Sequence, residues 1–185
     1  MRTLITTHFV SLDGVAEAPG GEAGYKHAGW TFDVPEDAAV YESKGAEQEE
    51  ATAMLMGGRS YEAFAPVWPK MDFFAGYNAM PKYVVSSTVT DPEWHDTTVL
   101  ASLDDVAALR EGDGGPIIVH GSLLLTQGLL AAGLVDEMRL TVFPVILGSG
   151  RRLFPDDAED KVKLTLVESR AFSNGVQLQV FRPER

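Results

Sequence analysis

The stretch Pro116–Leu134, PIIVHGSLLLTQGLLAAGL, is the feature that most constrains the fold of this chain. A β-branched run at Ile117–Val119 leads through a tight His120-Gly121-Ser122 turn into a leucine-rich helix that stops near Gly133. A strand that enters a helix through glycine leaves unpaired backbone N–H groups at the carboxyl end of a sheet, beside the positive end of the helix dipole. Anionic cofactors bind at such corners, but a plain β-α turn gives the same pattern.

A second corner of this kind occurs at Gly57-Gly58-Arg59-Ser60. It lies between Ala51–Met56, which has strand character, and Tyr61–Val67, which has helical character. Arginine pairs with phosphate through a bidentate fork, and the serine and backbone amides add further donors. Two such corners in one domain are less expected by chance than one, which favours phosphate binding at both.

The rest of the chain alternates between strands and helices. Further strands are predicted at Thr3–Val10, Lys82–Ser87, Thr98–Ala101 and Met138–Val145, the last interrupted by Pro144. Val162–Glu168 and Val176–Phe181 alternate with period two around Ser173-Asn174-Gly175, which predicts an antiparallel hairpin.

Two helices have recognisable start signals. Asp33 as N-cap, Pro35 in the first turn and Glu36 at the capping-box position predict a helix from Asp33 to about Glu50. Ser102-Leu103-Asp104-Asp105 begins a short helix by a similar pattern. Strands that alternate with helices through residue 134 imply a parallel sheet with helices on both faces. The sequence therefore predicts an α/β domain of about eight strands, closed by the antiparallel hairpin.

Composition narrows the function classes. At 185 residues and 45% hydrophobic content, the chain is expected to form one domain, residues 1–185, with its own core. The absence of cysteine excludes disulfides and thiolate metal sites, and the four histidines have no ligand spacing, so no metal is expected. A net charge of −12 argues against nucleic acid and anionic membranes, and no stretch predicts a signal peptide or membrane span. We expect a cytoplasmic protein with a small-molecule substrate.

For several polar residues the sequence allows both a structural and a functional role. Ser86 and Ser87 follow a predicted strand, where they either cap the next turn or contact a nucleotide. Asp13, in the turn Ser11-Leu12-Asp13-Gly14, is either a turn residue or a substrate-facing catalytic carboxylate, with Asp33 and Asp37 as further candidates.

Two segments are also open to two readings. The glycine-rich stretch Glu17 to Trp30 is either a surface loop or a lid over a site. Gly148-Ser149-Gly150-Arg151-Arg152 is either a ligand-facing basic loop or a solvated connection.

Taken together, these segments resemble the dihydrofolate-reductase-like superfamily, in the branch of the carboxyl-terminal reductase domain of bifunctional riboflavin-biosynthesis deaminase/reductase proteins. The residues of the resemblance are Ser11-Leu12-Asp13-Gly14, Leu123-Leu124, GLLAAGLVDE from Gly128, PVILGSG from Pro144, and Leu153-Phe154. MGGRSYE, from Met56, looks like the phosphate-binding corner of dihydrofolate reductases.

The resemblance implies a three-layer sandwich of the dihydrofolate-reductase type, a homodimer, and NADPH as cofactor. It assigns Gly57, Arg59 and Ser60 to the pyrophosphate or 2′-phosphate, and Ser86 and Ser87 to the 2′-phosphate end. Gly121, Ser122 and Leu123 would hold the pyrophosphate at the His120-Gly121-Ser122 corner. The first peptide of that corner is cis in dihydrofolate reductases, and the matching bond here is His120–Gly121, where a cis form costs about 3 kcal/mol.

The implied activity is hydride transfer from NADPH to a C=N or C=O of a small heterocycle, most like 5-amino-6-(5-phosphoribosylamino)uracil reductase. The alternatives are a dihydrofolate-reductase-type activity on a pterin and a non-catalytic nucleotide-binding protein. The chain departs from pyrimidine reductases at Val119-His120, where they carry a glutamate. Their substrate needs cationic partners for its phosphate, yet Lys26 and Lys44 are the only lysines or arginines between Asp13 and Gly58.

Overall fold

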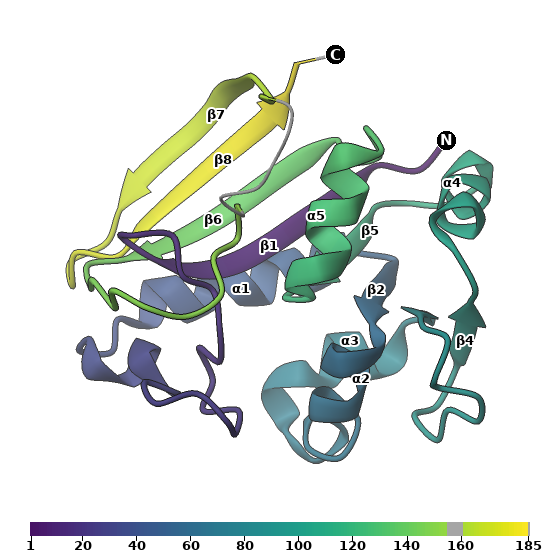
Figure 1. Ribbon diagram of the computed structural model, residues 1–185, viewed down its shortest axis with the longest axis horizontal. Helices are drawn as coiled ribbons and strands as arrows, with labels where there is room; N and C mark the ends of the chain where they lie inside the picture. The colour runs from purple at the N-terminus through teal and green to yellow at the C-terminus, as the bar shows by residue number, and fades with distance from the viewer. Residues whose placement is uncertain (155–160, 185) are drawn as a thin grey trace. The chain divides into compact units, whose positions relative to one another are not determined.

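The computed structural model describes residues 1–154 and 161–184. Eight strands form one mixed sheet in the order β4-β3-β2-β5-β1-β6-β8-β7 (Figure 1). The sheet is mostly parallel and ends in antiparallel carboxyl-terminal strands, so the predicted fold class is confirmed.

The chain divides into two compact units. One contains Met1–Thr6 and Ser43–Asp136; the other contains Thr7–Glu42 and the chain from Glu137 onward. Strand β1 (Leu4–Ser11) and helix α1 (Ala38–Glu50) contribute residues to both. The expectation of a single domain stays a prediction.

The first unit is the parallel part of the sheet. Strands β2 (Ala53–Gly57), β3 (Lys82–Val85), β4 (Thr97–Leu100) and β5 (Ile117–His120) pair in parallel. Its helices are α2 (Gly58–Phe64), α3 (Ala75–Ala79), α4 (Leu103–Glu111) and α5 (Leu123–Ala131), with 3-10 turns η2 (Trp68–Lys70) and η3 (Asp72–Phe74). Gly57 pairs with Val85, so β2 and β3 end level and their following turns are neighbours.

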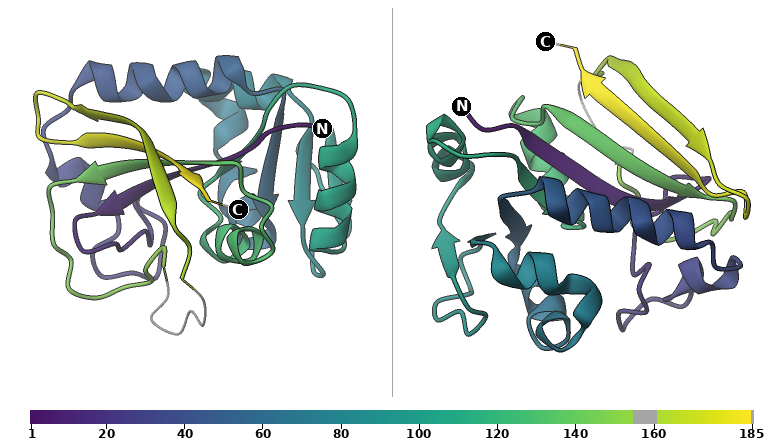
Figure 2. Two further views of the ribbon diagram at one scale, coloured as in Figure 1. Left: turned by 90° about the horizontal axis from the view of Figure 1, so that it is seen from above. Right: turned by 180° about the vertical axis from the view of Figure 1, so that it is seen from behind.

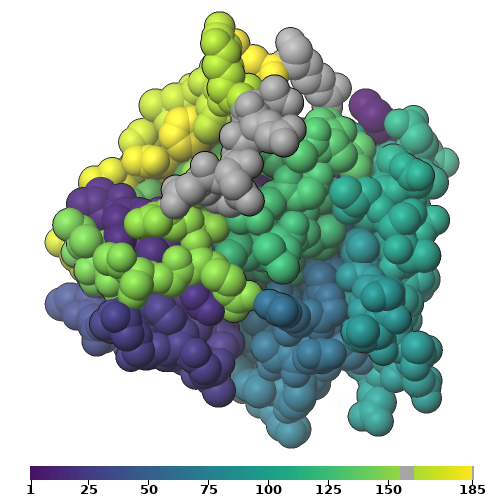
Figure 3. Space-filling model, viewed as in Figure 1, coloured from purple at the N-terminus to yellow at the C-terminus, as the bar shows by residue number. Residues whose placement is uncertain are grey.

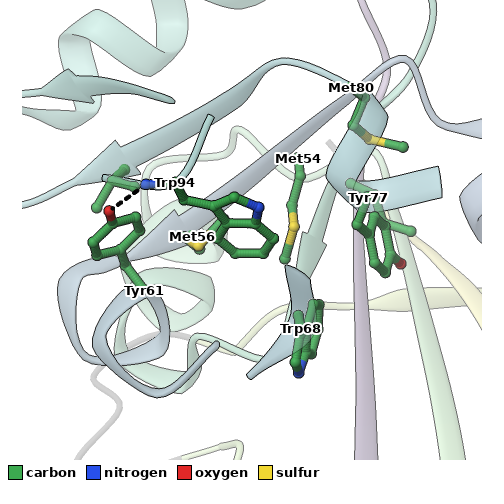
Figure 4. Close-up of a cluster of buried hydrophobic side chains, with 9 residues drawn as sticks. Met54, Met56, Tyr61, Trp68, Tyr77, Met80 and Trp94 are labelled. Carbon is green, nitrogen blue, oxygen red and sulfur yellow. Dashed lines mark hydrogen bonds between the residues drawn. The ribbon is translucent and has the colours of Figure 1, made fainter. Parts of the chain in front are cut away.

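An aromatic and methionine-rich cluster fills the first unit. Met54 and Met56 from β2 lie among Tyr61, Trp68, Tyr77, Met80 and Trp94, all of them buried (Figure 4). The Trp68 ring stacks between Phe64 and Phe74 with centroid separations of 3.9 Å on both sides. This packing holds α2, η2 and η3 against β2 and therefore fixes the helix that follows the Gly57 corner.

Lys82 opens β3 and is fully buried, which the sequence did not suggest. Its ammonium donates to the carbonyls of Tyr77, Asn78 and Met80, at the carboxyl end of α3. Burial lowers the pKa of Lys82, partly offset by the charge of Asp96. The side chain thus acts as a buried cap for a short helix.

The second unit is antiparallel. Strand β6 (Glu137–Phe143) pairs with β8 (Gln177–Pro183), which pairs with β7 (Leu164–Ala171) as the predicted hairpin (Figure 2). Gly175 adopts a φ of 85° in the connecting turn. The core of this unit joins the 3-10 turn η1 (Trp30–Asp33) to the sheet through Trp30, Val40, Phe143, Phe172, Val176, Leu178 and Val180.

The predicted start of the first helix is wrong. Asp33 ends η1, and α1 begins only at Ala38. Val34 precedes proline and is extended, with φ −96° and ψ 133°, because the proline ring disfavours a helical residue before it. The Asp37 carboxylate accepts the Ala39 N–H at 3.0 Å and takes the capping role expected of Asp33.

The predicted extent of the second helix also differs. We expected helical residues from Tyr61 to Val67, whereas α2 spans Gly58–Phe64. The helix therefore starts inside the glycine corner itself, and Gly57 is its N-cap residue.

Candidate functional site

The two glycine corners meet at the carboxyl ends of β2 and β5. The backbone N–H of Gly57 donates to Ser122 Oγ at 3.0 Å. A Cβ atom on Gly58 would lie 2.7 Å from Ser86 Oγ, so only glycine allows the corner to approach the turn after β3 this closely. The structure thus brings Gly57, Gly58, Ser86 and Ser122 together, all within the first unit.

The corner before α5 has an unusual backbone. Gly121 and Ser122 both adopt positive φ, 64° and 58°, which turns the chain sharply out of β5. Ser122 is the N-cap residue, but its hydroxyl accepts the Gly57 N–H rather than an N–H of its own helix. Among the described residues, no side chain caps α5. The first-turn amides, beginning at Leu123, therefore lack a side-chain acceptor, which suits an anionic ligand.

The corner before α2 is also uncapped by side chains in the described structure. Arg59 is exposed in the first turn of α2. Ser60 is half-buried in the first turn of the helix. A guanidinium, a hydroxyl and backbone donors are thus present together at the second corner.

Ser86 has a structural role in the turn after β3. Its hydroxyl accepts the backbone N–H groups of Thr88 and Val89, both at 3.1 Å. This is the turn-capping alternative of the two sequence readings. Ser87 is exposed on the same turn. Ser86 accordingly packs next to Gly58, and its nucleotide contact stays a prediction.

Asp13 is held by three donors in the second unit. Its carboxylate accepts the Ser11 hydroxyl at 2.7 Å and the backbone N–H groups of Leu147 and Gly148 at 3.1 and 2.9 Å. Burial raises the pKa of Asp13, but these hydrogen bonds outweigh it and lower the pKa to about 2. An ionised carboxylate with this many partners clamps a turn and is a poor proton donor near neutral pH.

The two further carboxylate candidates are also placed. Asp33 is exposed at the end of η1. Asp37 accepts from the Ser173 hydroxyl at 2.6 Å and from Ala39 N, and these hydrogen bonds lower the pKa of Asp37. It ties the helix start to the β7–β8 turn, so neither residue has an evident catalytic setting.

Two loops of the second unit, residues 11–17 and 145–153, form a surface that we call the platform. Leu12 N donates to Val145 O, Ala16 N to Arg151 O, and Leu153 N to Gly14 O, at 2.8 to 3.0 Å. Figure 3 shows the two loops side by side on the surface. The glycine-rich loop Gly148 to Arg152 is therefore bonded to the turn after β1 along its length.

His120 ends β5 directly before the Gly121 corner. Its Nδ1 lies 3.3 Å from the Tyr77 hydroxyl, and its ring forms a T-shaped pair with Trp68 at a centroid distance of 5.1 Å. The described chain contains no cis peptide bond, so a cis His120–Gly121 bond is not present.

Sequence reasoning missed two residues of this region. Gly58 was passed over in favour of its neighbours, although the adjacent pair of glycines was a signal for close backbone approach. Tyr77 offered no signal, because its contact with His120 joins residues 43 positions apart.

The fold and its paired glycine corners define an α/β domain of the dihydrofolate-reductase-like class. The model of the family described as the RibD C-terminal domain matches residues 2–178, so the chain belongs to that family. This family is a reductase domain of riboflavin-biosynthesis proteins, so the chain is a reductase-like domain.

The chain is also similar to one curated protein and to two solved structures. The "uncharacterized protein YyaP" of Bacillus subtilis (strain 168) is 27% identical over 183 residues, covering 95% of this chain and 92% of that protein. A crystal structure of a "putative riboflavin biosynthesis protein" from Shewanella sp. PV-4 has a TM-score of 0.80 at 23% identity and covers 99% of both chains. Acinetobacter baumannii RibD has a TM-score of 0.65 at 15% identity, and the match covers 59% of its chain. These two structures support the fold.

No helix in the described part of the chain is both long and apolar enough to span a bilayer.

Proposed function

We propose that this chain is an NADPH-dependent reductase acting on a C=N or C=O group of a small heterocyclic substrate. The observation that supports it most is the junction of the two uncapped corners through Gly57 N and Ser122 Oγ. Reductases of this family typically depend on a nucleotide cofactor. The donors at the junction fit the anionic part of such a cofactor.

Different residues suit different phosphate groups of the cofactor. The first-turn amides of α5, beginning at Leu123, and the backbone of Gly121 suit the pyrophosphate. Arg59 and Ser60 suit a further phosphate, and an exposed guanidinium favours the 2′-phosphate of NADPH over the bare ribose of NADH. When bound, the reduced nicotinamide supplies a hydride to the substrate carbon.

The reduction also needs a proton. Asp13 is not suited to this, since its lowered pKa keeps it ionised and three donors hold its oxygens. We propose that the proton comes from solvent. Asp13 instead holds the two loops of the platform together through its hydrogen bonds to Leu147 and Gly148.

The test is a thermal-shift titration with NADPH and NADH in parallel, followed by an assay of NADPH oxidation. A site-specific ligand at a hundredfold excess over its Kd should stabilise the protein by about 2.7 kcal/mol. We expect a larger rise in melting temperature with NADPH than with NADH. No rise with either nucleotide would reject the proposal, and binding without turnover over a panel of pterins, pyrimidines and carbonyl compounds would support a non-catalytic binding protein.

Two further expectations remain proposals. The homodimer implied by the family resemblance is tested by sedimentation equilibrium of the purified chain. A cytoplasmic location is tested by fractionating cells that express the full-length protein.

A further inference from the structure

His120 lies beside the nucleotide site proposed above. It is the last residue of β5 and directly precedes Gly121 and Ser122, which lead into α5. Consecutive Cα atoms are about 3.8 Å apart, so its side chain begins one residue from the backbone donors proposed to hold the pyrophosphate. His120 is half-buried and belongs to the same compact unit as both glycine corners. The edge of the proposed site therefore carries an imidazole.

Aromatic rings from three elements face the imidazole of His120. The rings of Phe64 on α2, Trp68 on η2 and Tyr77 on α3 lie at centroid distances of 6.2, 5.1 and 5.6 Å, with their planes steeply inclined to the imidazole. Both faces of Trp68 are covered, one by Phe64 and the other by Phe74. The imidazole therefore meets the edge of the indole, which carries the positive end of the ring quadrupole. This contact favours a neutral imidazole.

The Tyr77 hydroxyl orients this imidazole, since it lies 3.3 Å from His120 Nδ1. Tyr77 is buried and belongs, with Trp68, to the aromatic cluster of the first unit (Figure 4). The side-chain amide of Gln48 holds the same segment, because it donates to Phe73 O at 3.0 Å and accepts the Tyr77 N–H at 3.4 Å. The hydroxyl is therefore fixed in place. It accepts a hydrogen bond from a protonated imidazole and donates one to a neutral imidazole.

The charge on His120 depends on the groups around it. Of the three rings that face it, the Tyr77 phenol is the one that titrates, and α3 has no other titratable residue. The charged residues of α2 and η2 are Arg59, Glu62 and Lys70, and all three are exposed. A pyrophosphate bound at the neighbouring corner brings negative charge close to the imidazole. An opposite charge at short range stabilises the charged form of a titratable group, so the bound anion favours the imidazolium.

We propose that His120 takes up a proton when the nucleotide binds, and that its imidazolium then pairs with the pyrophosphate. The inference rests on the function proposed above and adds one reactant to the binding step, since neutral imidazole and a proton from solvent give the imidazolium of the complex. Tyr77 is a positioning residue, because it holds the ring beside the corner in both protonation states. The complex holds the proton more tightly than the free protein, so nucleotide affinity rises as the pH falls through the range in which histidine titrates.

Isothermal titration calorimetry measures the proton uptake. Heats of NADPH binding near neutral pH, in buffers of different ionisation enthalpy, give the number of protons taken up per nucleotide. We expect the wild type to take up about half a proton more than His120→Gln, and its affinity relative to that variant to rise about fivefold from about pH 8 to about pH 6. Comparing proteins with one nucleotide cancels the titration of the nucleotide's own phosphates. His95→Gln removes an exposed histidine and should behave as the wild type. Equal uptake by the wild type and His120→Gln would overturn the proposal.

NMR of the wild-type protein gives a second measurement that does not depend on how a variant folds. Spectra of protein labelled with 15N-histidine follow each imidazole across pH, with and without NADPH. We expect His120 to titrate at higher pH when NADPH is bound, and the exposed His95 to titrate at the same pH in both samples. Tyr77→Phe keeps the aromatic ring and removes the hydroxyl, so it should reduce the change at His120. An unchanged His120 titration in the wild type would overturn the proposal.

The two proposals fail in different ways. NADPH binding without a change at His120 would reject this inference and leave the reductase proposal standing. Absence of NADPH binding would reject the reductase proposal, and inorganic pyrophosphate then becomes the probe of the corner in the nucleotide-free protein. A His120 imidazole that titrates at higher pH with pyrophosphate would support the linked proton, and one that does not respond would reject this inference as well.

Discussion

Helices α4 and α5 each have a serine as N-cap residue after a parallel strand, yet the two serine hydroxyls have different partners. Ser102 is extended, with φ −153°, and forms a complete capping box with Asp105. Ser122 has a φ of 58°, and its hydroxyl oxygen accepts the backbone N–H of Gly57 on another corner. At the start of α4, side chains of the same helix start accept the backbone N–H groups, whereas at the start of α5 no side-chain cap does so.

This difference separates structural corners from candidate binding corners. A capping box occupies helix donors and places a carboxylate where an anion would otherwise bind. At α5 the serine instead fixes the distance between two corners and leaves the helix amides for a ligand. The Asp13 turn resembles α4 in this respect, because its donors and acceptors are matched within the second unit.

Exchanging each serine for alanine should give the largest contrast. Ser122→Ala removes the acceptor of the Gly57 N–H, so we expect a loss of about 1–3 kcal/mol in unfolding free energy and at least a tenfold weaker NADPH affinity. Ser102→Ala should lose about 1 kcal/mol of stability and keep its NADPH affinity. Chemical denaturation and nucleotide titration measure both. Equal effects on affinity would remove the distinction between the two helices.

Filling the contact between the β2–α2 corner and the β3 turn should have the next largest effect. Gly58→Ala puts a Cβ 2.7 Å from Ser86 Oγ, so the two turns must separate, at a cost of about 1–3 kcal/mol and with weaker nucleotide binding. Gly45→Ala on α1 meets no atom within 4 Å and should stabilise the helix by about 0.5–1 kcal/mol. Wild-type stability of Gly58→Ala would show that the corners are not tightly packed.

Asp13→Asn distinguishes a structural role of Asp13, in which its carboxylate holds the turn, from a catalytic role. Because the pKa of Asp13 is lowered from 3.8 to about 2, its stabilisation is present well above pH 3.8 and is lost as pH falls through 2. We expect the variant to lose about 1–2 kcal/mol at pH 7 after allowing for solvent screening, with a gap that closes in acid. The pH profile of NADPH oxidation should keep its shape. A shifted profile would return Asp13 to the mechanism.

Arg59→Gln should have the smallest effect, on affinity alone. We expect five- to tenfold weaker binding of NADPH, about 1 kcal/mol, and little change for NADH, because the proposal assigns the exposed guanidinium to the 2′-phosphate that only NADPH carries. Salt should reduce the difference. Lys70→Gln, which removes an exposed charge on η2, is the control and should bind both nucleotides normally. Equal losses for NADPH and NADH would exclude a contact with the 2′-phosphate.

Local signals predicted much of the fold. The capping box at Ser102, the Ser173-Asn174-Gly175 turn and both glycine corners are short-range features whose geometry follows from adjacent residues. The first helix was placed too early because two aspartates, Asp33 and Asp37, both suit a cap. Only the extended Val34 before proline separates them.

The candidate site was predictable in its residues but not in their contacts. That Ser122 bonds Gly57, 65 positions away, depends on sheet register, which no local pattern gives. The same holds for Lys44 and Lys82, whose charges appear available in the sequence but are buried against Glu47 and backbone carbonyls. Long-range partners decide which charges and donors remain for a ligand.

The central claim is that the helix amides at the start of α5 receive the cofactor while those of α4 do not. Backbone amide chemical shifts and hydrogen exchange during an NADPH titration test it directly. The account predicts large shifts and slower exchange at Leu123, Leu124 and Leu125, and none at Leu103, Asp104 and Asp105. Equal responses at both helix starts, or no response at α5 under saturating NADPH, would contradict it.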